Sequence, residues 1–170
     1  MQERHIVLSG EKVSIAEMRE EDQEQFYLWR RDHPELMTLV RDHGTPTLEG
    51  QKAWFRRSQE PDRHMFSIVL KENSALIGHG GFVDIEQEKD EAQFRITIGN
   101  PNYWGKGFGT EASSLIVQYG FDVLEFSSIW LRVPIDNERA EKSYRKLGFI
   151  ELGKEEFGGE EFIKMVRKRG

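Results

Sequence analysis

The sequence predicts a mixed α/β (α+β) fold with one central, mostly antiparallel sheet of about seven strands and helices on both faces. Three consecutive strand-like segments, residues 65–70, 75–85 and 91–99, are separated only by short turn-prone or charged loops. Segments with apolar residues at helical spacing lie before and after them. No repeat or Pro/Gly-rich linker divides the 170 residues. We therefore expect residues 1–170 to form a single domain.

The first half of the chain is expected to start with a strand and continue into two helices. Residues 12–18 alternate apolar with polar or small side chains, the pattern of a half-buried strand. Residues 21–32 place apolar side chains on one stripe of a helix, which Pro34 is expected to stop. Thr47 can cap a second helix that continues to residue 59.

The second half alternates between helices and strands. A helical pattern over residues 107–120 leads to a strand at 128–134, then to a helix at 138–147. Two closing strands are expected near Ile150 and at residues 161–166. The predicted order is therefore β-α-α-β-β-β-α-β-α-β-β.

Composition excludes several classes of protein. The formal net charge of −6 argues against a general nucleic-acid binder, which needs a basic surface, although many soluble proteins carry such a charge for solubility alone. The absence of cysteine excludes disulfides, thiolate zinc sites and a cysteine nucleophile. The first ten residues have no long apolar run, so we expect neither a signal peptide nor a membrane partner, and a cytoplasmic protein. The five histidines show no metal-binding spacing, and no metal is expected.

Residues 98–112 form the most informative segment, a strand that ends in a glycine-dense turn and opens a helix. Such a turn binds phosphate, because glycine lets the backbone approach an anion and the helix N-terminus presents free N–H groups. A P-loop is excluded because Lys106 is followed by glycine instead of Ser or Thr. A dinucleotide fingerprint fits poorly, since Gly105, Gly107 and Gly109 follow the spacing G-x-G-x-G.

This loop and a second motif resemble the GNAT superfamily of N-acetyltransferases, in the branch of ribosomal-protein alanine, spermidine and amino-sugar acetyltransferases. The signature Q/R-x-x-G-x-G/A corresponds to residues 104–109, where Trp104 replaces Gln or Arg, a replacement common in this branch. Residues 137–149 match N-x-x-A-x-x-x-Y-x-x-x-G-F. Two motifs in this order are more specific than either alone. The resemblance extends over residues 12–167.

The resemblance implies a GNAT fold whose fourth and fifth predicted strands splay apart, with acetyl-CoA as co-substrate and its pantetheine arm in the gap. Backbone amides there would hold the acetyl carbonyl, and the glycine loop would surround the pyrophosphate. Asn137 is equally well explained as a helix cap, and both roles can hold. The implied cofactor-binding residues are Ile96, Thr97, Ile98, Trp104, Gly105, Lys106, Gly107, Phe108, Gly109, Thr110, Asn137 and Tyr144.

The chemistry requires that the acceptor amine lose a proton before it attacks, since a lysine-like amine has a pKa of ~10.4. Tyr144 matches the family tyrosine that protonates the departing thiolate, although it could also be an ordinary packed aromatic. Relatives often carry Glu where Gln93 stands, and glutamine cannot accept the proton. Glu91 is our candidate catalytic base, with Asp84, His79 and ordered water as alternatives.

The acidic charge and the resemblance favour direct transfer to a primary amine of a small acceptor such as a polyamine or an amino sugar. Acetylation of the N-terminus of a ribosomal or other protein is the alternative. A non-catalytic acetyl-CoA-binding sensor is the alternative from another class, since the base is not identified. Exposed sheet edges are compatible with a homodimer.

Overall fold

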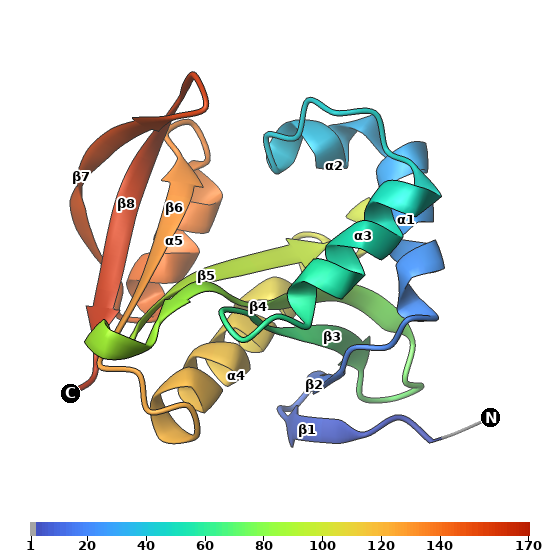
Figure 1. The fold of residues 1–170 in the computed structure, drawn as a ribbon, viewed down its shortest axis with the longest axis horizontal. Coiled ribbons are helices and arrows are strands. Elements are labelled where there is room, and N and C mark those ends of the chain that lie inside the picture. The colour runs from blue at the N-terminus through green and yellow to red at the C-terminus, as the bar shows by residue number, and fades with distance from the viewer. Residues whose placement is uncertain (1–2) are drawn as a thin grey trace.

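The computed structural model describes residues 3–170 and contains one sheet with five α-helices (Figure 1). Short 3₁₀ helices lie at Gln87–Lys89 and Pro101–Tyr103. The helices are α1 (Asp22–Asp32), α2 (Pro34–Leu39), α3 (Leu48–Ser58), α4 (Phe108–Asp122) and α5 (Glu138–Lys146). The strands are β1 (Ile6–Ser9), β2 (Val13–Glu17), β3 (His64–Leu70), β4 (Leu76–Glu86), β5 (Glu91–Ile98), β6 (Ser128–Pro134), β7 (Ile150–Phe157) and β8 (Glu160–Lys168).

The sheet confirms the predicted fold class. Its strand order is β1-β2-β3-β4-β5-β6-β8-β7, and every neighbouring pair is antiparallel except β5 and β6. It has eight strands where about seven were expected, because the four-residue β1 pairs with β2. A strand of four residues is too short to show a clear alternation of apolar and polar side chains. β1 is therefore recognised by its pairing with β2 and not by its own sequence pattern.

The helix α2 was also missed, for a different reason. Pro34 was expected to stop α1, and α1 does end there, with His33 as its C-terminal cap. However, the same proline occupies the first turn of α2, where a missing N–H costs nothing and a fixed φ favours the helix. One proline therefore ends one helix and begins the next.

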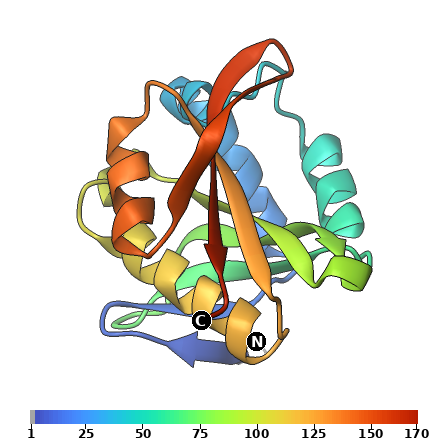
Figure 2. The same cartoon turned by 90° about the vertical axis from the view of Figure 1, so that its left-hand side faces the viewer.

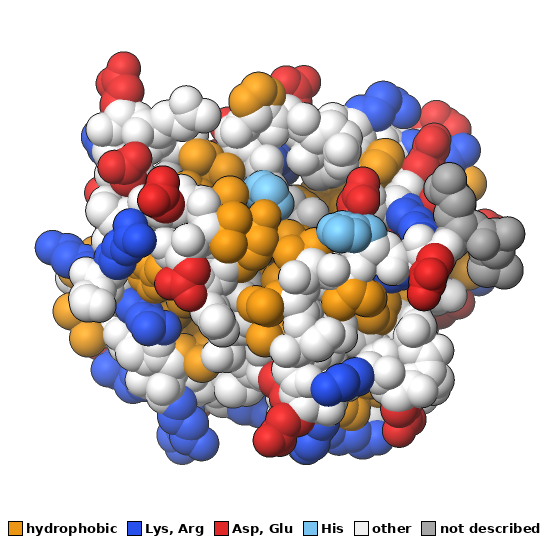
Figure 3. Space-filling view, turned by 90° about the horizontal axis from the view of Figure 1, so that it is seen from below, with side chains coloured by type: hydrophobic (Ala, Val, Ile, Leu, Met, Phe, Trp, Pro, Cys, Tyr) orange, Lys and Arg blue, Asp and Glu red, His pale blue; other side chains and the backbone are white. Residues whose placement is uncertain are grey.

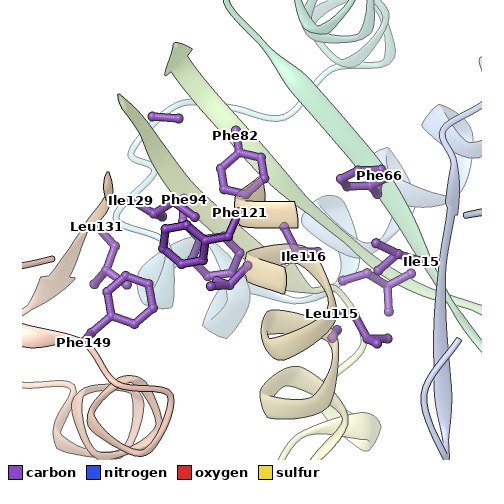
Figure 4. Packing of buried hydrophobic residues seen from close by; sticks show 14 of the residues in the cluster. Ile15, Phe66, Phe82, Phe94, Leu115, Ile116, Phe121, Ile129, Leu131 and Phe149 are labelled. Carbon is purple, nitrogen blue, oxygen red and sulfur yellow. The ribbon is translucent and has the colours of Figure 1, made fainter. Parts of the chain in front are cut away.

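Helices cover both faces of the sheet, as predicted. On one face, α4 and α5 pack on the larger apolar cluster, in which Phe94 and Phe121 are buried (Figure 4). On the other face, α1, α2 and α3 form a smaller cluster around Phe26, Trp29 and Leu36.

The strands β5 and β6 diverge after a short paired stretch. Their parallel pairing consists of Glu91 with Ser128, Ala92 with Ile129, and Gln93 with Trp130. Beyond Gln93, β5 continues to pair with β4 and β6 with β8, so the two halves of the sheet turn away from each other (Figure 1). The predicted splay is therefore present, and it opens toward the glycine loop.

On the surface, the face on which β1 and α4 lie has acidic and basic side chains interspersed around apolar ones (Figure 3). In the part of the chain that the structure describes, no helix is long and apolar enough to cross a membrane.

Candidate active site

One wall of the splay is the free edge of β5. Ile96, Thr97 and Ile98 lie beyond the last residue pair with β6 and have strand partners only on β4. The carbonyl of Ile98 accepts a hydrogen bond of 2.8 Å from the indole Nε1 of Trp104. The main-chain edge between Gln93 and Ile98 is therefore available to an extended ligand, because no strand pairs with it there.

The glycine loop follows this edge directly. Gly105 and Gly107 have φ values of +77° and +85°, in the left-handed region that favours glycine. Gly107 is the N-cap of α4, so the first free N–H groups of that helix lie beside the loop. Lys106 between the two glycines is exposed, and the ring of Phe108 packs on the preceding 3₁₀ helix. The predicted anion-binding geometry, a turn that opens a helix of 15 residues, is thus formed.

The N-terminal half of α5 lies across a groove from the glycine loop. The hydroxyls of Thr110 and Ser143 are 2.8 Å apart and connect α4 to α5. The groove has a volume of about 670 Å³, within the range of small-ligand sites. Three cations of α5 line it, Arg139, Lys142 and Lys146. Cations opposite a helix N-terminus suit a ligand with several phosphates.

Asn137 combines the two roles that the sequence left open. Its Oδ1 accepts a hydrogen bond of 3.2 Å from the backbone N–H of Ala140, so it caps α5. It also lines the groove across from the glycine loop. A neighbouring cavity of about 240 Å³, which it lines as well, is bounded by α2, Trp104 and Pro134. The cap is thus present, and the cofactor contact stays a prediction.

Tyr144 lies on the α5 side of the splay. Its ring meets Phe94 and Phe149 edge-on, each with a centroid separation of 6.1 Å. Within residues 3–170 its hydroxyl has no hydrogen-bond partner. Burial raises the pKa of Tyr144 to about 12. The phenol therefore keeps its proton at any physiological pH and is free to donate a hydrogen bond.

The candidate bases are not gathered around Tyr144. Glu91 lies at the closed end of the splay, opposite Ser128. His79 packs between the rings of Phe26 and Trp54 on the other face of the sheet. Burial, and then the charge of Arg30, lower the pKa of His79 to about 4, which makes it a poor proton acceptor.

Asp84 is the remaining base candidate, and Gln93 occupies the position where relatives often carry a glutamate. Asp84 is exposed on a bulge of β4, with a φ of +50°. Gln93 is only 3% exposed at the point where the strands part, and its amide Oε1 has no partner within the described residues. A buried polar atom without a partner is costly, so Gln93 is a natural contact for a ligand or a water molecule in the splay.

Sequence reasoning missed an ionic bridge at the open end of the splay. Arg41, in the loop after α2, pairs with Asp136 and lies 3.2 Å from Glu160, measured from Nε to Oε2. The Nε2 of His43 is 2.7 Å from Oε1 of the same glutamate. Figure 2 shows that this loop lies beside the β7–β8 turn. We call Arg41, His43, Asp136 and Glu160 the ionic strap.

Among the described residues, no group of three or more histidine, aspartate or glutamate side chains could hold a metal ion.

Comparison with known proteins identifies the family. Residues 12–150 match the family model described as an acetyltransferase (GNAT) domain. A segment of 106 residues is 45% identical to the spermidine N(1)-acetyltransferase of Escherichia coli K12, covering 59% of this chain and 56% of that protein. Another of 96 residues is 36% identical to the uncharacterized N-acetyltransferase p20 of Bacillus licheniformis, covering 56% and 53%. The matches thus span about half the length of these relatives.

Solved structures show the same fold at low sequence identity. The spermidine N-acetyltransferase of Vibrio cholerae in complex with CoA and spermine superposes with a TM-score of 0.83 at 20% identity, over 92% of this chain and 95% of that one. A GNAT-family acetyltransferase from Bacillus anthracis superposes with a TM-score of 0.79 at 19% identity, over 95% and 97%.

Proposed function

We propose that this chain transfers the acetyl group of acetyl-CoA to a primary amine. The chain belongs to the GNAT acetyltransferase family, which supports this proposal. The observation that carries the proposal is the splay between β5 and β6, which opens onto the N-terminus of α4. An extended ligand that ends in phosphates matches both parts of this site, the free strand edge and the glycine loop.

The residues present fit acetyl-CoA. Arg139, Lys142 and Lys146 line the groove across from the glycine loop, where the phosphates of CoA would lie. The free edge of β5 offers main-chain groups to the pantetheine amides. When bound, acetyl-CoA supplies the acetyl group as an activated thioester.

The side chains of this site divide the proton transfers. The amine must lose a proton before its nitrogen attacks, and Gln93 cannot accept that proton, so a water molecule or a carboxylate at the mouth of the splay must do so. As the C–S bond breaks, negative charge develops on sulfur. Tyr144, with a pKa of about 12 against ~8.5 for a thiol, then stabilises the sulfur mainly by donating a hydrogen bond, since complete proton transfer is uphill.

The names of the relatives suggest which amine is acetylated. Curated relatives in Escherichia coli and Vibrio cholerae are named as spermidine acetyltransferases, and one solved neighbour was crystallised with spermine. A polyamine is therefore the first acceptor to test. An amino sugar and a protein N-terminus are the alternatives.

The proposal is tested by measuring thiol release from acetyl-CoA with a panel of amines that includes spermidine, glucosamine and peptides with free N-termini. We expect release that depends on the amine and yields an equal amount of acetylated product. If the chain binds CoA but releases no thiol from acetyl-CoA with any of the amines, it would instead be a non-catalytic sensor. The glutamine at position 93 would suit that role.

A further inference from the structure

A group of cations lies on the side of the splay opposite to Tyr144. Gln93 and Trp130 are paired neighbours, so the alternate residues Arg95 on β5 and Arg132 on β6 project from the same face of the sheet. On β8, Lys164 is the register partner of Arg132. This face looks toward α1 and α3, and not toward α5.

The cations are close enough to influence one another. Partial burial lowers the pKa of Arg95 and the charge of Asp84 raises it, while the charges of Arg63 and Arg132 also lower it. Arg132 stacks over the rings of Trp130 and Phe157, at 4.8 and 4.3 Å from their centroids. The ammonium of Lys164 lies 4.5 Å from the ring of Trp130 on the same wall.

Most of this positive charge has no partner. Arg132 is paired with Glu155. Within residues 3–170, by contrast, the side chains of Arg63 and Arg95 make no hydrogen bond or ion pair, and the buried Nε of Arg63 is unsatisfied. This is unusual in a protein whose net charge is −6, because carboxylates are plentiful elsewhere on the chain. Unpaired guanidinium groups beside an open site suit carboxylate or phosphate oxygens, which they can bind with two parallel hydrogen bonds.

We propose that the acceptor carries an anionic group, a carboxylate or a phosphate, a few bonds from its amine, and that Arg95 and Arg63 bind this group at the splay. The proposal rests on the acetyl transfer proposed above and restricts the class of amines that can serve as acceptor. It disfavours a free polyamine, whose charges would all be repelled by these arginines. Gln93, which is buried beside Arg95 at the point where β5 and β6 part, would face the amine.

Pairs of amines that differ only in the anion test the proposal. Ornithine is putrescine with a carboxylate, and glucosamine 6-phosphate is glucosamine with a phosphate. We expect kcat/KM for the anionic member of at least one pair to exceed that of its partner by about tenfold or more. Raising the ionic strength should reduce this preference, because salt screens the attraction between the arginines and the anion. The pair that shows the preference distinguishes the carboxylate from the phosphate.

The variant Arg95→Gln assigns the preference to the cation group. The side chain of Arg95 makes no hydrogen bond or ion pair within residues 3–170, so its replacement should leave the fold intact, which a thermal melt would verify. We expect kcat/KM for the amine with the anionic group to fall about tenfold, while that for the partner amine that lacks this group is unchanged or rises. The control Arg31→Gln removes an arginine that is paired with Asp32 on the outer side of α1, and should change neither value.

The outcomes separate this inference from the proposed activity. Turnover of spermidine and putrescine that equals or exceeds that of the anionic amines, and is insensitive to Arg95→Gln, overturns the inference and leaves acetyl transfer intact. If no amine releases thiol, calorimetric titration of ornithine, putrescine and the two sugars into the CoA-bound protein decides. Tighter binding of an anionic member that Arg95→Gln abolishes supports the anion site, and equal binding within each pair refutes it.

Discussion

Burial shifts the pKa values of two side chains in opposite directions. It raises the pKa of Tyr144 to about 12 and lowers that of His79 to about 4. In both cases the low-polarity surroundings penalise the charged form, which is the phenolate for tyrosine and the imidazolium for histidine. Both side chains are therefore neutral near pH 7. Tyr144 can act there as a hydrogen-bond donor, and His79 acts as a packed aromatic ring.

Replacing Tyr144 by phenylalanine should remove the hydrogen bond to sulfur and leave the ring packing unchanged. We expect kcat to fall by about 10²-fold, with little change in KM for acetyl-CoA, because the interaction forms only as the C–S bond breaks. Steady-state kinetics would measure both values, with Tyr119→Phe as the control on α4. In the wild-type enzyme, the raised pKa predicts that ionisation of Tyr144 does not limit kcat below about pH 11. An unchanged kcat in Tyr144→Phe would contradict the assignment.

The lowered pKa of His79 predicts a loss of stability in acid. Its pKa in the folded state is below that of the unfolded chain, so the unfolded state binds a proton first as the pH falls. The free energy of unfolding should therefore decrease between about pH 6.5 and pH 4, by up to about 3 kcal/mol from this group. Urea unfolding at several pH values would measure it, and His79→Phe should show a shallower dependence. Equal slopes for the two proteins would argue against a buried neutral His79.

At the scale of elements, α4 is held at both ends of its first turn. Its N-terminus begins at the glycine loop, and the carboxylate of Glu111 reaches back to the turn between β1 and β2. That carboxylate accepts hydrogen bonds of 3.0, 2.9 and 2.7 Å from the backbone N–H groups of Glu11, Lys12 and Val13. The sheet edge and the helix that follows the glycine loop are thus coupled through one side chain.

Replacing Glu111 by alanine should leave three backbone donors without their acceptor. We expect a loss of about 1–3 kcal/mol in the free energy of unfolding, since charge-assisted bonds are replaced by water at a partly buried turn. Chemical unfolding would measure it, beside Glu72→Ala, an exposed glutamate in the β3–β4 turn. If both variants lose the same stability, the bonds of Glu111 contribute nothing specific.

At the scale of the molecule, the splay separates the sheet into two parts that remain connected at both ends. At the closed end, three residue pairs join β5 to β6. At the open end, the ionic strap joins the loop after α2 to the loop before α5 and to the β7–β8 turn. A ligand in the splay would thus be bounded at both ends as well as by the two strands.

Replacing Arg41 by glutamine should loosen the open end without unfolding the protein. Ion pairs this exposed contribute little to global stability, so we expect a change of about 1 kcal/mol or less in the free energy of unfolding. Amide hydrogen exchange, however, should accelerate in residues 40–47 and around Glu160, and not in β3 or β4. The variant Arg57→Gln, which removes the exposed pair with Asp62, should leave the exchange of both segments unchanged. Unchanged exchange in Arg41→Gln would show that the strap does not hold the mouth.

Most of the correct predictions from the sequence depend on patterns that extend over only a few residues. Strand alternation, helix stripes, the left-handed glycines and the cap at Asn137 each depend on neighbours along the chain, and all are present in the structure. The family motifs at residues 104–109 and 137–149 are of the same kind. They predicted the fold, which the structure confirms, and the residues that are candidates for cofactor binding.

Only the tertiary structure decided which charged side chains lie around the splay. Arg41 meets Asp136 across 95 positions of sequence, and Arg63, Arg95 and Arg132 approach one another from three separate strands or strand ends. The tertiary fold likewise left Glu91 at the closed end of the splay. Such proximities depend on which strands pair and where two of them part, and a pattern within a few residues does not encode contacts between segments far apart in the sequence.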